Sequence, residues 1–186
     1  MVDNMLVWAY CQSMKTVLEH LKDRHLDVNL HRPMIDEEER VATFYLYDLV
    51  GRAVGYHQYR PEGEKKLPND FKNGKYFTWR KGYAPWGVES LYLTPHVVFI
   101  TEGMFDAARL TERGYSALAT LSNDPQSDFK NWLRFLGCRV IAVCDNDNAG
   151  RRLAKFGDVA VFTEEKDLGD SSDEYVDWLV KEYGNA

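Results

Sequence analysis

The sequence predicts an α/β protein in which helices flank a Rossmann-like parallel sheet, preceded by a small basic α+β subdomain. From Val97 onward, short apolar runs alternate with segments of helical periodicity. Before them, two β-rich runs surround a turn. The chain of 186 residues is 45% hydrophobic, which is enough to bury a core in one domain with a smaller subdomain. We therefore expect two parts, residues 1–95 and residues 96–186.

The first part opens with apolar residues at roughly helical spacing, which predict an amphipathic helix over residues 4–24. The stretch IDEEER, residues 35–40, is interpreted as an acidic linker. Residues 42–60, ATFYLYDLVGRAVGYHQYR, predict a β-hairpin around a turn at residues 48–51. A further short strand is predicted at KYFTW, residues 75–79.

The second part alternates strands and helices with short connections. Strands are predicted at VVFI, YSALAT, RVIAVC and DVAVFT, which are residues 97–100, 115–120, 139–144 and 158–163. Helices are predicted over residues 104–114, 127–137 and 149–157, the first two ending at a glycine. A last helix begins at Ser171, which has Glu174 at capping-box spacing. This alternation predicts a parallel, doubly wound sheet.

Charge is distributed unevenly along the chain, whose formal net charge is −6. Between Arg52 and Lys81, eight basic residues stand against three acidic ones, whereas after Gly157 two lysines stand against nine carboxylates. The middle of the chain suits a polyanion, and the tail would repel one unless cations lie between them. The total charge argues against a general nucleic-acid coat.

Several classes of protein are excluded by composition. The apolar runs are too short for a membrane span, and the N-terminal residues lack the order of a signal peptide, so we expect a cytoplasmic protein without a membrane partner. Three scattered cysteines without a CxxC pair provide neither a disulfide framework nor a zinc ribbon.

Carboxylates follow three of the predicted strands. Glu102 follows VVFIT, Asp145 and Asp147 follow RVIAVC, and Asp167 comes shortly after DVAVFT. The carboxyl ends of parallel strands meet at one edge of the sheet, where ligands bind. In an extended segment, alternate residues point the same way, so Asp145 and Asp147 should converge. The carboxylates would repel one another unless a divalent cation lay between them, and an all-oxygen site favours Mg²⁺ or Mn²⁺ over Zn²⁺.

Other interpretations of these acids stay open. A DxD after a strand is also typical of a solvated turn or a helix N-cap. Asp106 is interpreted as organising the start of its helix rather than binding metal, and Asp170 as a possible further metal ligand.

Three motifs, TEGMFDA, VCDNDNAG and EKDLGD, resemble the TOPRIM domain, an acidic α/β catalytic module shared by bacterial-type primases, type IA and type II topoisomerases and some nucleases. The resemblance covers roughly Val97 to Asp170 and implies a TOPRIM-type sheet. It implies that Glu102, Asp145 and Asp147 are catalytic, Glu102 as a general base or shared metal ligand. The expected metal ligands are Glu102, Asp145, Asp147, Asp167 and Asp170.

The segment before these motifs resembles the basic subdomain that precedes TOPRIM in bacterial-type primases, where a GRvvGf turn leads to an Arg, then KYlN, KG and LYG. Here the corresponding stretches are LYDLVGRAVGYHQYR, KYFTWRKG and WGVESLY, so FTW after KY and WGVESLY in place of LYG depart from the pattern. The resemblance implies that this segment binds nucleic acid and nucleotides, and an ordinary solvated hairpin face is the alternative. The residues expected to bind are Arg60, Lys65, Lys66, Lys75, Tyr76 and Lys81.

Together the two resemblances imply a DNA primase-like nucleotidyltransferase that makes short RNA primers on single-stranded DNA from ribonucleoside triphosphates with Mg²⁺. The economy of the chain suggests phage-type replication, hence the cytoplasm of a bacterial host. A Mg²⁺-dependent TOPRIM nuclease is the alternative enzyme, and a non-catalytic nucleic-acid-binding or assembly module is the alternative outside enzymes. A topoisomerase is disfavoured, because the chain has no room for a separate domain carrying the strand-cleaving tyrosine.

Two partners are expected in trans, since the sequence shows neither a zinc ribbon nor a helicase-binding domain: a zinc-ribbon protein and a replicative helicase. The helix expected at residues 4–24 is a candidate docking element, or it packs on its own domain.

Overall fold

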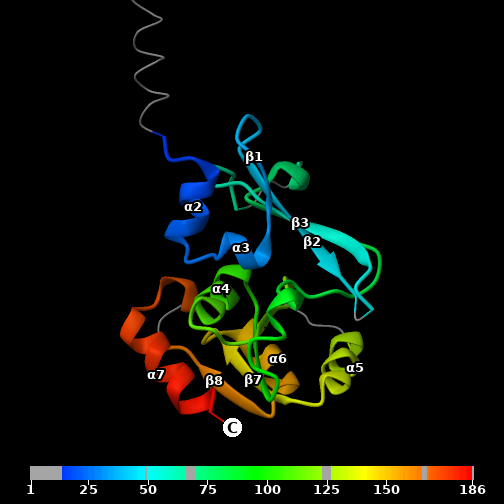
Figure 1. Cartoon of the computed structure of the whole chain (residues 1–186), viewed down its shortest axis with the longest axis vertical. Helices are drawn as coiled ribbons and strands as arrows, with labels where there is room; N and C mark the ends of the chain where they lie inside the picture. The colour runs from blue at the N-terminus through cyan, green and yellow to red at the C-terminus, as the bar shows by residue number, and fades with distance from the viewer. Residues whose placement is uncertain (1–13, 49, 66–69, 123–126, 165–166, 186) are drawn as a thin grey trace, which may run out of the picture.

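A computed structural model describes residues 14–48, 50–65, 70–122, 127–164 and 167–185. It contains two four-stranded sheets, an antiparallel one in the first half of the chain and a parallel one in the second (Figure 1). The antiparallel sheet has the order β1-β2-β3-β4, with strands Met34–Asp36, Val41–Tyr47, Ala53–Tyr59 and Tyr76–Arg80. The hairpin predicted over residues 42–60 is thus confirmed as β2 and β3, with Tyr45 opposite Tyr56.

The hairpin turn is fixed by Asp48. Its carboxylate accepts hydrogen bonds from the backbone N–H groups of Val50 and Arg52 at 3.0 and 2.9 Å. An Asx-type bond of this kind replaces the ladder bonds that the chain loses where it reverses. The strand predicted at KYFTW is also confirmed, as β4, one residue later than expected.

Two expectations for the N-terminal region are wrong. A helix across residues 4–24 is not continuous, because Thr16 and Glu19 form a capping box that starts α2, Val17–Asp23; residues 4–13 lie outside the described residues. The first two residues of the supposed acidic linker, Ile35 and Asp36, belong to β1, which pairs with β2. Glu37, the next residue of the same acidic stretch, accepts hydrogen bonds from the N–H groups of Val17 and Leu18. It therefore satisfies backbone donors at the start of α2. A short helix, α3 (Val28–His31), lies between these elements.

The parallel sheet confirms the alternation predicted from the sequence. Its order is β6-β5-β7-β8, with strands Ala117–Ala119, Val97–Thr101, Arg139–Cys144 and Val159–Phe162. The helices are α4 (Met104–Glu112), α5 (Ser127–Leu136), α6 (Asn148–Leu153) and α7 (Asp173–Tyr183). Four 3₁₀ turns are η1 (Phe71–Asn73), η2 (Val88–Ser90), η3 (Ala154–Phe156) and η4 (Leu168–Asp170).

Both faces of the parallel sheet are covered, which explains its nearly unbroken apolar strands. Residues Phe99 and Ile141 on one face pack with α4 and α7, and Ile100 and Ala142 on the other pack with α5 and α6. Figure 1 shows α4 and α7 on one side of this sheet and α5 on the other.

The predicted start of the last helix is one residue too early. Ser172 is the N-cap of α7, and its hydroxyl accepts a hydrogen bond from the N–H of Tyr175. Ser171 instead donates its hydroxyl hydrogen bond to the carbonyl of Asp167. By sequence either serine could cap the helix. Ser171 ends η4 as its C-cap, so Ser172 starts α7.

One apolar core connects the two sheets. Phe44 of β2, Tyr59 of β3 and Phe105 of α4 belong to it, and the rings of Tyr59 and Phe105 meet edge to face at 4.9 Å between centroids. An isolated bridge between Trp86 and Ala119 also joins the two halves of the chain. The division at residues 95 and 96 stays a prediction. Across the described ranges, no helix has the length and apolar character needed to cross a bilayer.

Candidate active site

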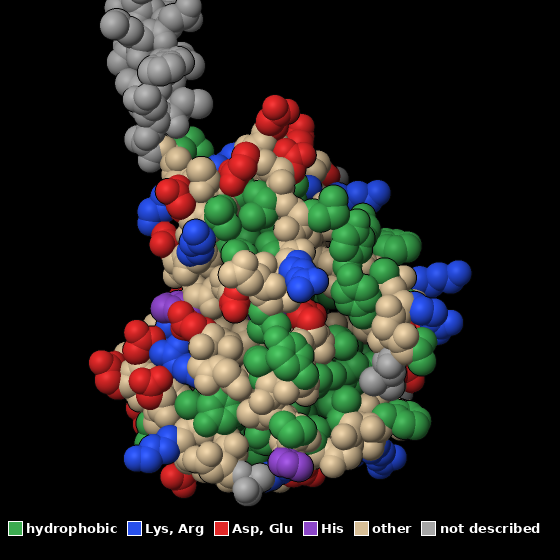
Figure 2. All heavy atoms as spheres, in the orientation of Figure 1, with side chains coloured by type: hydrophobic (Ala, Val, Ile, Leu, Met, Phe, Trp, Pro, Cys, Tyr) green, Lys and Arg blue, Asp and Glu red, His purple; other side chains and the backbone are tan. Residues whose placement is uncertain are grey.

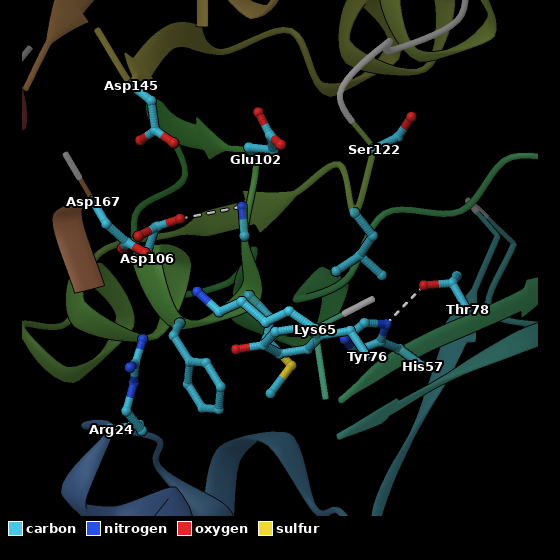
Figure 3. Close-up of a pocket in the computed structure, with 14 residues that line it drawn as sticks. Arg24, His57, Lys65, Tyr76, Thr78, Glu102, Asp106, Ser122, Asp145 and Asp167 are labelled. Carbon is cyan, nitrogen blue, oxygen red and sulfur yellow. Dashed lines mark hydrogen bonds between the residues drawn. The ribbon is translucent and has the colours of Figure 1, made fainter. Parts of the chain in front are cut away.

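A cavity of about 350 Å³ lies between the carboxyl edge of the parallel sheet and the inner face of the antiparallel sheet. Figure 3 shows carboxylates on one side of it, Arg24 reaching from below, Lys65 lying across it, and the antiparallel sheet closing the other side. It is lined by Arg24, His57, Lys65, Tyr76, Thr78, Glu102, Gly103, Met104, Phe105, Asp106, Leu121, Ser122, Asp145 and Asp167.

Glu102 and Asp145 come from the ends of the two central strands, β5 and β7, and line the cavity as predicted. Burial raises the pKa of Glu102, and the charges of Asp145 and Asp147 raise it further. The following Gly103 leaves room for a neighbouring carboxylate, because a Cβ there would lie 2.7 Å from Oδ2 of Asp106. The sequence pair Glu-Gly therefore places two acids at one helix start.

Asp147 does not converge with Asp145 in the way that an extended segment predicts. Strand β7 ends at Cys144, and the chain then turns, with the N–H of Asp147 bonded to the carbonyl of Asp145 at 2.8 Å. The exposed Asp147 carboxylate is the N-cap of α6 and accepts hydrogen bonds from the N–H groups of Ala149 and Gly150. Asp147 acts on the site through its charge on Glu102, and its role as a metal ligand stays a prediction.

Asp106 and Asp167 form a second acidic pair, on the side of the cavity toward α4. Asp106 accepts hydrogen bonds from the N–H groups of Gly103 and Gly169 at 3.2 and 2.8 Å, so it organises the start of α4, as predicted. Burial, and then its hydrogen bond to Asp167, hold the pKa of Asp106 well above its usual range. The same hydrogen bond lowers the pKa of Asp167, helped by its bond from Gly169 and by Arg24 and Lys65. Asp106 therefore carries the proton of the pair, and Asp167 the charge.

Asp170 and Arg24 lie next to this pair. Asp170 is exposed, does not line the cavity, and forms an ion pair of 3.3 Å with Arg24. Arg24 does line the cavity, with its guanidinium 4.6 Å from the centroid of the Phe105 ring. Arg24 is not among the residues predicted from the sequence, because a basic residue at a helix C-terminus is common and no motif marks this one.

The six residues predicted to bind nucleic acid or nucleotides fall into three groups. Lys65 and Tyr76 line the cavity, and Lys65 extends across it toward Asp106 and Asp167 (Figure 3). Arg60, Lys75 and Lys81 do not line it, although the N–H of Arg60 bonds to the carbonyl of Lys75. Lys81 lines a different groove, on the outer face of the antiparallel sheet. The sixth residue, Lys66, lies outside the described residues.

His57 supports the wall that carries Tyr76. Its ring is buried beside that of Tyr76, at 6.1 Å between centroids and 15° between planes, and its Nδ1 bonds to the Thr78 hydroxyl at 2.8 Å. Burial, with a contribution from Arg80, lowers the pKa of His57 to about 3. The ring is therefore neutral at physiological pH and adds no charge to the site.

The donor set of the cavity fits a hard cation such as Mg²⁺. Within the described ranges, no three acidic, histidine or cysteine side chains lie close enough to form a complete metal cage. Mg²⁺ usually takes one or two protein carboxylates and fills its shell with water and substrate phosphates, and the pair Glu102 and Asp145 meets that requirement. The residues present therefore fit the metal.

We expect Glu102→Gln to raise the melting temperature of the metal-free protein by about 1–3 °C at neutral pH. Because the pKa of Glu102 is raised in the folded chain, its contribution to stability is greatest below the ordinary pKa of 4.5 and falls as pH rises through the folded pKa. The advantage of glutamine should therefore vanish in acid. Calorimetric scans across pH test this, with the exposed Glu64→Gln as control. Saturating Mg²⁺ should reverse the order, since it would bind wild type better. An unchanged melting temperature at neutral pH would contradict the predicted repulsion.

Comparisons with known proteins bear on the fold of this chain. No protein-family model and no curated protein matches the sequence. Among solved structures, the RNA polymerase domain of Mycobacterium tuberculosis primase DnaG, in complex with a double-stranded DNA oligomer with a 6-nucleotide overhang, superposes with a TM-score of 0.57 at 18% identity, covering 96% of this chain and 64% of that one.

Two other solved structures give the same picture. A DNA primase domain from Pseudomonas aeruginosa gives a TM-score of 0.56 at 18% identity, over 88% of this chain and 58% of that one. A DnaG primase catalytic domain bound to single-stranded DNA gives a TM-score of 0.53 at 19% identity, over 89% of this chain and 56% of that one. Across the primase structures compared, the chain spans 39% to 66% of the other chain's length. The chain therefore shares the fold of about half to two thirds of these DnaG primase catalytic cores, in line with the primase-like fold that its sequence predicted.

Proposed function

We propose that this chain is a DNA primase-like nucleotidyltransferase that synthesises short RNA primers on single-stranded DNA in a Mg²⁺-dependent reaction. The observation that carries the proposal is the composition of one cavity. Carboxylates from the ends of β5 and β7 face a lysine, an arginine and an exposed tyrosine from the first half of the chain. Such a cavity can hold metal-bound phosphates on one side and a base on the other.

The carboxylates would take the following roles. Glu102 and Asp145 would hold the metal, with Asp147 and Asp167 as further candidates at the same edge. When bound, Mg²⁺ would neutralise the triphosphate and stabilise the pyrophosphate leaving group. In the alternative role of general base, Glu102 would accept the proton of the attacking 3′-hydroxyl, which a raised pKa favours.

The basic and aromatic groups would position the substrates. Lys65 and Arg24 line the same cavity as Glu102 and Asp145 and would donate charge-assisted hydrogen bonds to phosphate oxygens of a nucleotide. Tyr76 is 39% exposed and would contact a base, with its ring packed beside those of His57 and Tyr59. Neighbours of this fold include one bound to single-stranded DNA, which supports a DNA strand as template.

One assay separates this proposal from its alternatives. Purified chain is incubated with Mg²⁺ and a labelled single strand, with and without the four ribonucleoside triphosphates. New RNA oligomers that require template, nucleotides and metal support the primase. Shortening of the strand without elongation would support the nuclease. Neither reaction, together with no Mg²⁺ or Mn²⁺ binding by calorimetry in the presence of strand and nucleotide, would favour a non-catalytic module. A phage setting, a helicase and a zinc-ribbon protein stay predictions.

A further inference from the structure

The outer face of the antiparallel sheet carries a row of aromatic side chains. Tyr45, Tyr56 and Trp79 stand at paired positions of β2, β3 and β4, so they share one face. Phe44 and His57, which alternate with them, point to the opposite face, toward the core and the cavity. Trp79 is 51% exposed and Tyr45 47%, and the rings of Tyr56 and Trp79 stack at 5.8 Å between centroids.

Two grooves meet on this face. The first, of about 300 Å³, is lined by the three rings together with Lys81 and the small residues at the start of β3. The second, of about 400 Å³, is lined by Tyr45 again, by Tyr47 and Tyr92, and by Arg32 among others. Because Tyr45 belongs to both, the grooves form one track, which we call the outer aromatic face. Figure 2 shows hydrophobic side chains gathered over β2 and β3, with Lys and Arg side chains at the adjoining edge.

Charge on this track favours an anionic occupant. Lys81 and Arg32 are exposed, and neither forms an ion pair with a carboxylate in the part of the chain that the structure describes. The first groove has no carboxylate among its described lining residues, and in the second Glu89 is already bonded to His31 at 2.5 Å. Rows of exposed rings interleaved with cations bind single strands, since bases stack on the rings and phosphates pair with the cations.

We propose that the outer aromatic face is a second binding site for single-stranded nucleic acid, separate from the cavity. The choice of ligand rests on the proposed function. A single-stranded nucleic acid that contacts both the cavity and the outer aromatic face would pass around β4, the edge strand of the antiparallel sheet. Thr78 of β4 lines the cavity, and its neighbour Trp79 lies on the outer face.

Equilibrium binding of the full chain to a fluorescent thymidine oligomer of about 16 nucleotides tests the proposal. Trp79→Ala and Tyr45→Ala should each weaken binding by about 5- to 100-fold, the usual effect of removing one stacking ring. Trp79→Phe should keep most of the affinity. Both positions are exposed, so the variants should melt like wild type. Phe135→Ala is the matched control, an exposed ring on α5 whose removal should leave affinity unchanged.

Photocrosslinking of a strand that contains 4-thiothymidine gives a direct readout, with adducts expected on peptides of β2 and β4. A wild-type chain that binds no single strand would overturn the proposed function and this site together. Normal binding by Trp79→Ala and Tyr45→Ala would overturn this site alone. If the variants lose self-association in sedimentation but keep their strand affinity, the face is a protein contact and the proposal fails.

Discussion

Asp145→Asn is expected to reduce primer synthesis by about a thousandfold or more while the chain stays folded, because metal-assisted charge stabilisation contributes several kcal/mol. Asp145 stands at the end of central strand β7, lines the cavity, and raises the pKa of Glu102. The substitution removes the charge of one of the two carboxylates proposed to hold the metal. Initial rates of RNA synthesis measure the loss, and isothermal titration measures Mg²⁺ affinity.

A second readout distinguishes this role from a purely structural one. In the metal-free protein, the pKa of Glu102 should be lower in Asp145→Asn than in wild type, since one of the charges that raise it is gone, and titration of the Glu102 carboxyl by NMR measures the change. Asp128→Asn is the control, an exposed acid in the first turn of α5. Wild-type synthesis by Asp145→Asn would remove Asp145 from the metal site.

Gly150→Ala is expected to destabilise the chain by about 3 kcal/mol or more, a fall of about 6–12 °C in melting temperature, and to abolish activity. A Cβ at this position would lie 1.9 Å from the carbonyl oxygen of Asp145 and 2.9 Å from its N and C atoms. These are backbone atoms, which cannot rotate away, so either α6 or Asp145 must move. Intrinsic helix propensity alone would favour alanine by about 1 kcal/mol. A loss of stability in this variant would therefore result from the close contact with Asp145 and not from helix propensity.

Thermal unfolding and RNA synthesis are measured together for this variant. Gly74→Ala is the control, since that residue has φ −64° and the nearest atom to its added Cβ would be 3.3 Å away. Its stability should change by no more than about 1 kcal/mol. A Gly150→Ala chain as stable as wild type would show that the close approach of α6 to Asp145 does not hold the site together.

Local patterns in the sequence predicted the elements of this fold and two of its central carboxylates. Apolar runs predicted β5 and β7 because both faces of the central strands are buried, and two β-rich runs around a turn in residues 42–60 predicted the hairpin. Since strand ends of a parallel sheet share an edge, Glu102 and Asp145 could be placed near each other without coordinates. These inferences depend only on neighbours in the chain and on the handedness of connections.

Tertiary packing decided which other residues complete the cavity. Arg24 and Lys65 reach it because the antiparallel sheet packs on α4 through Tyr59 and Phe105, a contact between distant segments, and the Arg24 guanidinium lies over the Phe105 ring. Asp147 became an N-cap because α6 starts immediately after the turn, where unpaired N–H groups compete for its carboxylate. The aromatic residues of β2, β3 and β4 form one row only in the register that the sheet adopts. A sequence specifies which groups are available, but long-range packing brings distant ones together, because apolar burial is non-directional and the final fit depends on the whole core.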